Sequence, residues 1–382
     1  MLFTSYTPTK ICFGTLDYDS LSSEISGYGR EVLILCGGKS TKKIAEKIAD
    51  GIGKEFSMTL IDGIKSNPEI KLLEDTLNRI KKPDVILTVG GGSVHDSGKA
   101  LSLGFTHSTD IEEYTTDGKL SVPGIHKNIV PVITIPTIFG TGSEVSAASL
   151  LRIDNRKRVI FSPYLYPKAA FIDASLADEL PDSLCINAAL DALTQGIESL
   201  VSLKAQSFSK RYSYSAIQRV ISALLRLSDG QEKYGVSEDL ALAAVEAMYA
   251  VIQTSVGAAH AISDPLSGRY DIHHGEAVAT LLPYVCEANY GAASVEYDAV
   301  QDIIEEKTGR KFGGICEALL CLYEQIGFDC HMMGAKIDKA VFFRDFNEVI
   351  RESYNGDLDG NPTEMTDEII RTILRKAVGD MR

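Results

Sequence analysis

The first half of the chain alternates short aliphatic or β-branched runs with helical patterns of apolar residues. Candidate strands lie at residues 31–36, 58–61, 84–89, 130–135 and 169–172, and helical patterns at residues 40–52 and 69–82 separate the first three. This order is typical of βαβ units and predicts a mostly parallel sheet. Ligands of such sheets bind beyond the carboxyl ends of the strands, so we expect functional residues there.

From about Asp178 the strand-like runs give way to long helical patterns, separated by glycine, asparagine and aspartate. We predict helices at residues 182–202, 208–228, 238–257, 277–290, 295–308, 312–326, 339–354 and 366–379. The predicted fold is an α/β N-terminal domain, residues 1–177, followed by an all-α C-terminal domain, residues 178–382. Residues 146–157, with the run on to Pro163, predict a β-hairpin on the edge of the sheet.

Composition and charge limit the classes of partner and the cellular location that we expect. The chain of 382 residues has a net charge of −14 and no concentrated basic face, which argues against nucleic acid or an anionic membrane surface as a partner. No segment reaches the roughly 18 apolar residues of a membrane span, and the first residues lack the pattern of a signal peptide. Seven cysteines, mostly in apolar surroundings and without a CxxC pair, favour reduced core residues. We expect a small-molecule partner and a cytoplasmic location.

Two turns rich in glycine and hydroxyl residues follow predicted strands. After residues 84–89 come Gly91, Gly92 and Ser93 at the start of a helical pattern, where free backbone amides favour an anion such as a phosphate. After residues 130–135 comes TIFGTGSE, residues 137–144, whose hydroxyls and amides suit the ribose and phosphates of a nucleotide. The glycine run at residues 90–92 is, by itself, equally well explained as a tight turn that binds nothing. Two such turns on one sheet favour a nucleotide site.

A third stretch, residues 257–283, holds three of the seven histidines among residues typical of a packed core. His260 lies in a helical pattern that Pro265 and Gly268 interrupt, and His274 precedes a second pattern that begins near Gly275. Two histidines from helical segments joined by a loop can converge, and imidazole is both the commonest metal ligand and a ready proton donor. The alternative is that these are core and helix-end histidines bonded to backbone carbonyls.

Motifs along nearly the whole chain resemble, in the expected order, those of the iron-containing (group III) alcohol dehydrogenase family. They are GGGSVHDSGK, PTIFGTGSEVS, the pair Asn67-Pro68, DALTQGIE at residues 191–198, the histidine stretch and the closing NPTEMTDEIIRTIL. The resemblance implies a dehydroquinate synthase-like fold, with a dinucleotide-binding α/β domain followed by an all-helical domain. It also implies hydride transfer between NAD(P) and an alcohol or aldehyde in the cleft between the domains, by a homodimer or larger homo-oligomer.

The resemblance assigns cofactor-binding residues as well. It implies that the pyrophosphate and adjoining ribose lie at Gly91, Gly92, Ser93 and Asp96. The path toward the nicotinamide is implied to run along Thr137, Thr141 and Ser143. Asn67 is expected to help hold the cofactor, and Arg158 or Lys157 occupies the region of a family lysine that touches it.

The turn after residues 31–36 bears on the choice of cofactor. An acidic residue there normally accepts hydrogen bonds from the adenosine ribose and repels a 2′-phosphate. This chain has Gly37, Gly38 and Lys39, with two further lysines following and no acid before Glu46. Such a neutral-to-basic turn tolerates the 2′-phosphate. NADP is therefore the preferred cofactor over NAD, with Gly37 among the cofactor-binding residues.

The family holds a divalent metal, Fe2+ or Zn2+, with an aspartate, a histidine four residues later and two histidines of the later stretch. The matching residues here are Asp191, Gln195, His260 and His274. A spacing of four places the first two side chains on one face of a helix. Glutamine is a poor ligand because it offers only a neutral carbonyl oxygen. The metal site is therefore expected to be weakened.

Two mechanisms stay open. With metal, the ion polarises the substrate oxygen as a Lewis acid while hydride passes to or from the nicotinamide. Without metal, His260 or His274 has to donate the proton and stabilise the oxyanion, held by Asp191. A catalytically silent nucleotide-binding homologue and a non-redox enzyme like dehydroquinate synthase are the remaining alternatives.

Two further residues near the histidines have both a functional and a structural interpretation. Asp264, four residues after His260, stands where many family members have another histidine, and it is a third catalytic candidate. Its alternative role is an N-cap or turn residue before Pro265. Arg269 either meets an acidic group on a substrate or pairs with a nearby aspartate, Asp264 or Asp271.

Overall fold

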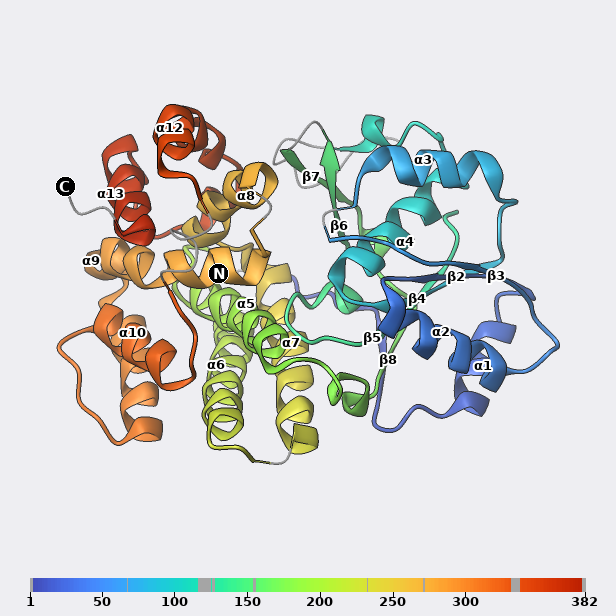
Figure 1. The fold of residues 1–382 in the computed structure, drawn as a ribbon, viewed down its shortest axis with the longest axis horizontal. Coiled ribbons are helices and arrows are strands. Elements are labelled where there is room, and N and C mark those ends of the chain that lie inside the picture. Colours follow the sequence, from blue (N-terminus) through green and yellow to red (C-terminus); the bar gives the residue numbers. More distant parts are fainter. Residues whose placement is uncertain are drawn as a thin grey trace. The chain divides into compact units, whose positions relative to one another are not determined.

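The computed structural model of the chain describes residues 3–66, 68–115, 125, 128–153, 156–231, 233–270, 272–330 and 337–379. The described chain forms two compact units (Figure 1). We call the unit of Tyr6–Ile138 and Gly142–Asp178 the sheet unit. The helical unit contains the chain from Glu179 onward, together with residues 3–5 and the short segment Phe139–Thr141.

Six parallel strands form the centre of the sheet unit. They are β1 (Lys10–Phe13), β2 (Glu31–Cys36), β3 (Ser57–Ile61), β4 (Val85–Gly90), β5 (Val132–Pro136) and β8 (Ala169–Ile172). Their order is β1-β8-β5-β4-β2-β3, and every neighbouring pair is parallel, which confirms the predicted parallel sheet. The strand β1 was not predicted, because its residues are mostly exposed and lack an apolar run.

Successive side chains of a strand point to opposite faces of the sheet, and each face packs against a different pair of helices. Val32 and Ile34 of β2 pack with α1 (Tyr18–Ser26) and α2 (Lys39–Ile52). The alternate residues Leu33 and Leu35 pack with α3 (Ile70–Arg79) and α4 (Gly92–Gly104). Because both faces of β2 are covered, its sequence EVLILC is apolar throughout rather than alternating.

The predicted β-hairpin is present, but its predicted place on the edge of the sheet is wrong. Strands β6 (Ala148–Ile153) and β7 (Arg156–Phe161) form a separate antiparallel pair, while the edges of the six-stranded sheet are β1 and β3. The pair packs over α4 instead, where Ser149 Oγ donates a 2.8 Å hydrogen bond to the backbone oxygen of Asp96. Leu151 and Ile160 join the core beneath it, and this burial explains the placement.

The helical unit is built around α5. Its helices are α5 (Asp182–Val201), α6 (Ser207–Ser228), α7 (Lys233–Thr254), α8 (Ala258–Tyr270), α9 (His274–Thr308), α10 (Ile315–Gln325), α12 (Lys339–Ser353) and α13 (Asp367–Val378). Figure 1 shows α5, α6 and α7 packed side by side, and α5 also contacts α9. Every residue of α5 from 188 to 201 is buried, so each polar residue in that stretch needs a partner inside the protein.

The predicted interruption of the first histidine helix by Pro265 and Gly268 is wrong, because α8 runs unbroken through both residues. Proline has no N–H to bond the carbonyl of Ala261 four residues earlier. Asn355 supplies the missing donor, since its Nδ2 lies 3.4 Å from the oxygen of Ala261. In α9, by contrast, the two predicted helices are separated by a non-helical residue, Ala293.

No single described helix is long and apolar enough to cross a membrane. Taken together, the segments Gly235–Thr254 and Ala258–Tyr270 have the length and apolar composition of a membrane span, but they are bent by 105° relative to each other.

Candidate functional site

Three of the four predicted metal ligands meet in the helical unit. Asp191 comes from α5, His260 from the first turn of α8, and His274 is the first residue of α9. One donor atom of each lies within 4.8 Å of the other two. The two imidazole rings stand 5.3 Å apart between centroids at an angle of 65°.

The local packing of α9 against α5 explains how His274 reaches this place. Gly275 lies so close to α5 that a Cβ on it would stand 2.0 Å from the backbone oxygen of Asn187. Only glycine allows this approach. The start of α9 is thereby held one helical turn from Asp191.

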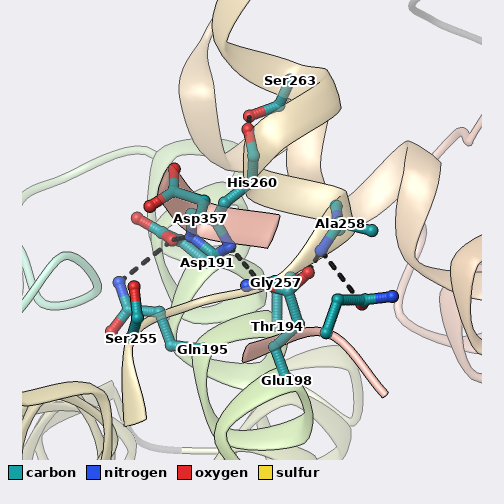
Figure 2. Close-up of polar contacts among 12 residues, drawn as sticks. Asp191, Thr194, Gln195, Glu198, Ser255, Gly257, Ala258, His260, Ser263 and Asp357 are labelled. Carbon is teal, nitrogen blue, oxygen red and sulfur yellow. Dashed lines mark hydrogen bonds and ion pairs between the residues drawn. The ribbon is translucent and has the colours of Figure 1, made fainter. Parts of the chain in front are cut away.

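Glu198, which the sequence analysis missed, contacts the nitrogen of His260 that points away from Asp191. It lies seven residues after Asp191 on the same face of α5, and its carboxylate is 4% exposed. It accepts hydrogen bonds from the backbone N–H groups of Gly257 at 2.9 Å and Ala259 at 2.6 Å, and it contacts His260 Nδ1 at 2.6 Å (Figure 2). Glu198 therefore caps the start of α8 and directs the other ring nitrogen of His260 toward Asp191, at 3.3 Å from Oδ1.

The charges of this cluster are strongly coupled. Burial by itself raises the pKa of the Asp191 carboxyl, but the charge of His274 and hydrogen bonds from His260 and Gln195 outweigh it and lower the pKa to about 2. Burial by itself lowers the pKa of His260, but the charge of Glu198 and hydrogen bonds to both carboxylates outweigh it and raise the pKa to about 10. Since histidine binds a metal only as the neutral imidazole, a metal held by His260 would displace this proton.

Gln195, the fourth predicted ligand, lies beside Asp191 but presents its amide nitrogen. Nε2 donates to Asp191 Oδ1 at 3.2 Å and to the backbone oxygen of Thr141 at 3.3 Å. Figure 2 shows the contact between the two side chains. The other end of the amide, Oε1, is buried and has no hydrogen-bond partner among the described residues.

Asp264 and Arg269 lie farther along α8. Asp264 is partly buried inside the helix, one turn after His260, so the alternative role as an N-cap or turn residue is wrong. Arg269 makes two hydrogen bonds with Glu352 of α12, from Nε at 3.0 Å and from Nη2 at 2.7 Å, and Nη2 also lies 3.3 Å from Glu348. These partners of Arg269 are carboxylates of α12, and Asp271, one of the two aspartates suggested by the sequence, lies outside the described residues.

In the sheet unit, predicted cofactor residues follow the carboxyl ends of three adjacent strands. Gly37 follows β2, Gly91 follows β4 and Thr137 follows β5. The N–H of Thr137 donates to the oxygen of Gly90 at 3.0 Å, which joins two of these turns. The chain leaves β2 toward β3 on one side and β4 toward β5 on the other, so the turns of Gly37 and Gly91 flank a topological switch point.

The turn after β4 has the geometry of an anion site. Gly91 is the N-cap of α4 and makes no side-chain cap, and Gly92 and Ser93 form the first turn. The backbone amides there point toward the end of the helix, where a negative charge is favoured. A Cβ on Gly91 would lie 2.9 Å from the side-chain methyl Cγ2 of Ile138, so a larger residue here would require that side chain to shift.

Asp96 and Ser143 are buried in a cluster around Lys99. Ser143 Oγ donates to Asp96 Oδ1 at 2.6 Å. The ammonium of Lys99, which is 0% exposed, donates to Ser143 Oγ at 2.7 Å and lies 3.3 Å from Asp96 Oδ1. It also donates to Ser146 Oγ at 3.0 Å and to the backbone oxygen of Ala148 at 2.6 Å. The resemblance assigns Asp96 and Ser143 to the cofactor, and that assignment stays a prediction; their described contacts join α4 to the turn after β5.

The remaining predicted cofactor residues are less closely grouped. Arg158 and Lys157 lie on β7 and are partly buried. Thr141 is exposed and belongs to the helical unit. Asn67 lies outside the described residues.

An acidic residue that the sequence analysis did not consider lies next to the turn of Gly37. The segment after β3 returns to this turn, where Gly63 donates its N–H to the oxygen of Gly37 at 2.7 Å. Asp62 stands beside it and forms an exposed ion pair with Lys42, at 2.7 Å. The turn therefore carries both signs of charge, whereas the sequence predicted a neutral-to-basic turn.

Comparisons with known proteins agree with this arrangement. Residues 8–174 match the family "Iron-containing alcohol dehydrogenase", and residues 185–378 match "Fe-containing alcohol dehydrogenase family, C-terminal". The chain is 27% identical over 362 residues to a 1,3-propanediol dehydrogenase of Klebsiella pneumoniae, covering 90% of this chain and 92% of that protein. It is 30% identical over 277 residues to the long-chain-alcohol dehydrogenase 1 of Geobacillus thermodenitrificans, covering 70% and 68%.

A solved structure of an iron-containing alcohol dehydrogenase from Thermococcus thioreducens is similar with a TM-score of 0.86 and 28% identity, over 98% of this chain and 100% of that one. The chain belongs to the iron-containing alcohol dehydrogenase family. The predicted class of oxidoreductase, which transfers hydride between NAD(P) and an alcohol or aldehyde, is confirmed.

The residues present fit the divalent metal of this family. Asp191, His260 and His274 offer one carboxylate and two imidazoles, a donor set that suits Fe2+ or Zn2+. Three protein ligands are enough for a catalytic metal, because such sites keep a position open for water or substrate.

Proposed function

We propose that this protein interconverts an aldehyde and its alcohol with NADP(H), using a divalent metal held by Asp191, His260 and His274. The convergence of these three donor atoms within 4.8 Å carries the proposal. Both the buried carboxylate and its two imidazole neighbours are arranged by contacts from α5, the helix that also bears the family motif DALTQGIE.

Each residue has a distinct part in this reaction. When bound, the cation supplies Lewis-acid polarisation of the substrate oxygen, which favours hydride transfer at the adjacent carbon. Asp191 supplies the negative charge of the site, and Glu198 fixes the orientation of His260 through its Nδ1. Gly91, Gly92 and Ser93 hold the cofactor pyrophosphate with backbone amides.

The preference for NADP rests on the turn after β2. Gly37 and Gly38 leave room for a 2′-phosphate, and Lys39 adds positive charge. Asp62 opposes this preference, but its charge is compensated by Lys42. We expect a higher kcat/KM with NADPH than with NADH, and Lys42→Ala to shift the ratio toward NADH because it leaves Asp62 without this cation. A ratio that favours NADH in the unaltered enzyme contradicts the assignment.

The resemblance to a family of oligomeric enzymes supports a homodimer or larger homo-oligomer. Light scattering coupled to size-exclusion chromatography measures the mass in solution, and a monomer at working concentration contradicts this part of the proposal.

Reconstitution tests the reaction. Enzyme stripped with a chelator should oxidise NADPH slowly when offered a panel of short and medium-chain aldehydes, and Fe2+ or Zn2+ should restore turnover. Asp191→Ala should stay inactive after the same treatment, whereas Asp229→Ala, an exposed aspartate at the end of α6, should recover fully. Turnover that is independent of metal would move the chemistry to proton donation by His260 or His274.

A further inference from the structure

The position that breaks the family's metal-ligand pattern makes two specific contacts. Gln195 is 4% exposed, and its Nε2 donates to a metal-binding carboxylate, Asp191, and to a backbone oxygen, that of Thr141. We propose that Gln195 is a bridge rather than a ligand, which fastens Thr141 to Asp191 and leaves the metal with three protein ligands. The inference rests on the proposed metal centre and adds a positioning residue to it.

The amide orientation follows from its two neighbours. Turning the side chain over would place Oε1 where Nε2 now lies, 3.2 Å from Asp191 Oδ1 and 3.3 Å from the oxygen of Thr141. Gln195 Oε1 would then face the oxygens of Asp191 and Thr141 with no hydrogen between them, which is unfavourable because all three atoms are acceptors. A bound cation would compensate the charge of Asp191, but the Thr141 oxygen would still face an acceptor.

The Thr141 oxygen cannot easily move aside. Its segment, Phe139–Thr141, belongs to the helical unit, and Phe139 is only 3% exposed. A Cβ on Gly140 would stand 2.2 Å from the backbone oxygen of Ala188 on α5, so the backbone is packed tightly there. The next residue, Gly142, has a φ of +64°, which fixes the direction in which the chain leaves this contact.

The bridge connects two parts of the proposed reaction. The turn of Thr141 is the one that the sequence associates with the nicotinamide, and Asp191 is a ligand of the metal. A histidine at position 195 would add a third imidazole to the metal but could not donate to both oxygens in the same way. Compared with histidine, Gln195 would lower the affinity for metal but fix the turn of Thr141. A metal held by three protein ligands would have one more position for water or substrate than a metal held by four.

Hydrogen exchange of the segment 139–142 tests the bridge directly. In the full-length protein, Gln195→Leu removes the amide with little change in volume, so the segment should exchange faster by roughly fivefold, as expected for a lost hydrogen bond worth about 1 kcal/mol. Zinc should leave the protection of the unaltered protein unchanged or increase it. Gln301→Ala, which removes a partly buried glutamine of α9, is the matched control and should not alter exchange at 139–142.

X-ray absorption of the zinc-loaded proteins tests the ligand count. The unaltered protein should show two imidazoles around zinc, whereas Gln195→His should show three and bind zinc more tightly, by about tenfold or more. The inference is overturned if zinc binding lowers protection of 139–142 to the level of Gln195→Leu, because the glutamine then leaves the turn to bind metal. An imidazole count that stays at two in Gln195→His also overturns it.

The failure of the proposed function looks different. If the unaltered protein binds no zinc, the metal centre is wrong, and the inference falls with it as an account of metal binding. If zinc binds but Gln195→Leu exchanges at 139–142 like the unaltered protein, the metal centre stands and the bridge is wrong.

Discussion

Lys99→Met gives the most direct test of how the sheet unit holds together the two turns that are proposed to bind the cofactor. Lys99 is fully buried and donates to two serines and to the Ala148 oxygen, next to the Asp96 carboxylate. Its contacts tie α4, which begins at the glycine turn, to the turn after β5. Methionine keeps the length and the apolar part of the side chain but removes the charge and every donor.

The loss of stability in Lys99→Met follows from the buried groups that remain without the ammonium. Asp96, 7% exposed, keeps its hydrogen bond from Ser143 but loses its cation. Breaking a buried ion pair on one side costs about 3–5 kcal/mol, and the hydrogen-bond acceptors that lose their donor contribute part of this. For a unit of this size the melting temperature should fall by about 10 °C.

The deficit should also depend on pH. Burial raises the pKa of the Asp96 carboxyl, while the charge of Lys99 lowers it. Without Lys99 the pKa of Asp96 rises further, so the folded variant binds a proton that the unfolded chain does not hold. Folding with proton uptake is favoured at low pH, so the loss of stability should be smaller near about pH 5 than near about pH 8.

Circular dichroism is the suitable assay, because the chain contains no tryptophan for fluorescence. Lys47→Met, on the exposed side of α2, is the matched control and should melt within a degree or two of the unaltered protein. NADPH binding should weaken in Lys99→Met and not in the control. A Lys99→Met protein that melts like Lys47→Met at about pH 8 refutes the reasoning.

Three other substitutions test separate contacts. Glu198→Gln should lower zinc affinity by roughly 10–100-fold, because the carboxylate that orients His260 is lost, and competition with a chromophoric chelator measures it. An affinity equal to that of the unaltered protein would show that Glu198 only caps α8. Gly140→Ala should destabilise the helical unit by about 1–3 kcal/mol, because its Cβ would meet a backbone oxygen of α5 at 2.2 Å. Gly38→Ala is the control in the same melting experiment, because its added Cβ would have no described atom within 4 Å apart from its own chain neighbours. Glu144→Gln should stabilise the sheet unit at about pH 8 by up to about 3 kcal/mol and much less at about pH 5. Burial raises the pKa of the Glu144 carboxyl to about 7. At pH values between its ordinary pKa and about 7, folding therefore takes up a proton, and stability is lost as the pH rises through that range. Urea unfolding at the two pH values measures the difference, and an equal gain at both contradicts the cause.

The sheet could be predicted because its central strands are continuous apolar runs. EVLILC and VILTVG have no exposed face to be polar, and the glycines that follow them end the runs clearly. The strand β1 could not be found in the same way. It is held at the edge by pairing with β8, so its residues stay exposed and carry no pattern.

The histidine helix shows where local rules fail. Pro265 is normally a helix breaker, and the sequence gives no sign of the donor that compensates for it. That donor, Asn355, comes from 94 residues away along the chain. A tertiary contact thus replaces the missing backbone bond, which no local pattern can reveal.

The proposed metal ligands could be found from local patterns, whereas the residues that support them could not. Asp191, His260 and His274 could be located from motifs, because each motif has fixed spacing. Glu198 carries a signal only in retrospect: a carboxylate seven residues after Asp191 in a helix that is otherwise apolar has to be buried and paired. Asp62 had no signal at all, since its place beside Gly37 depends on the pairing of β3 with β2.

Metal content tests the central claim most directly. The protein, purified anaerobically without a metal-binding tag and incubated with Fe2+ or Zn2+, should retain about one metal per chain by elemental mass spectrometry. Asp191→Ala should retain none, because the proposed site would lose the one carboxylate among its three described donors. A protein that binds no metal, or an Asp191→Ala variant that binds as much as the unaltered chain, would contradict the account.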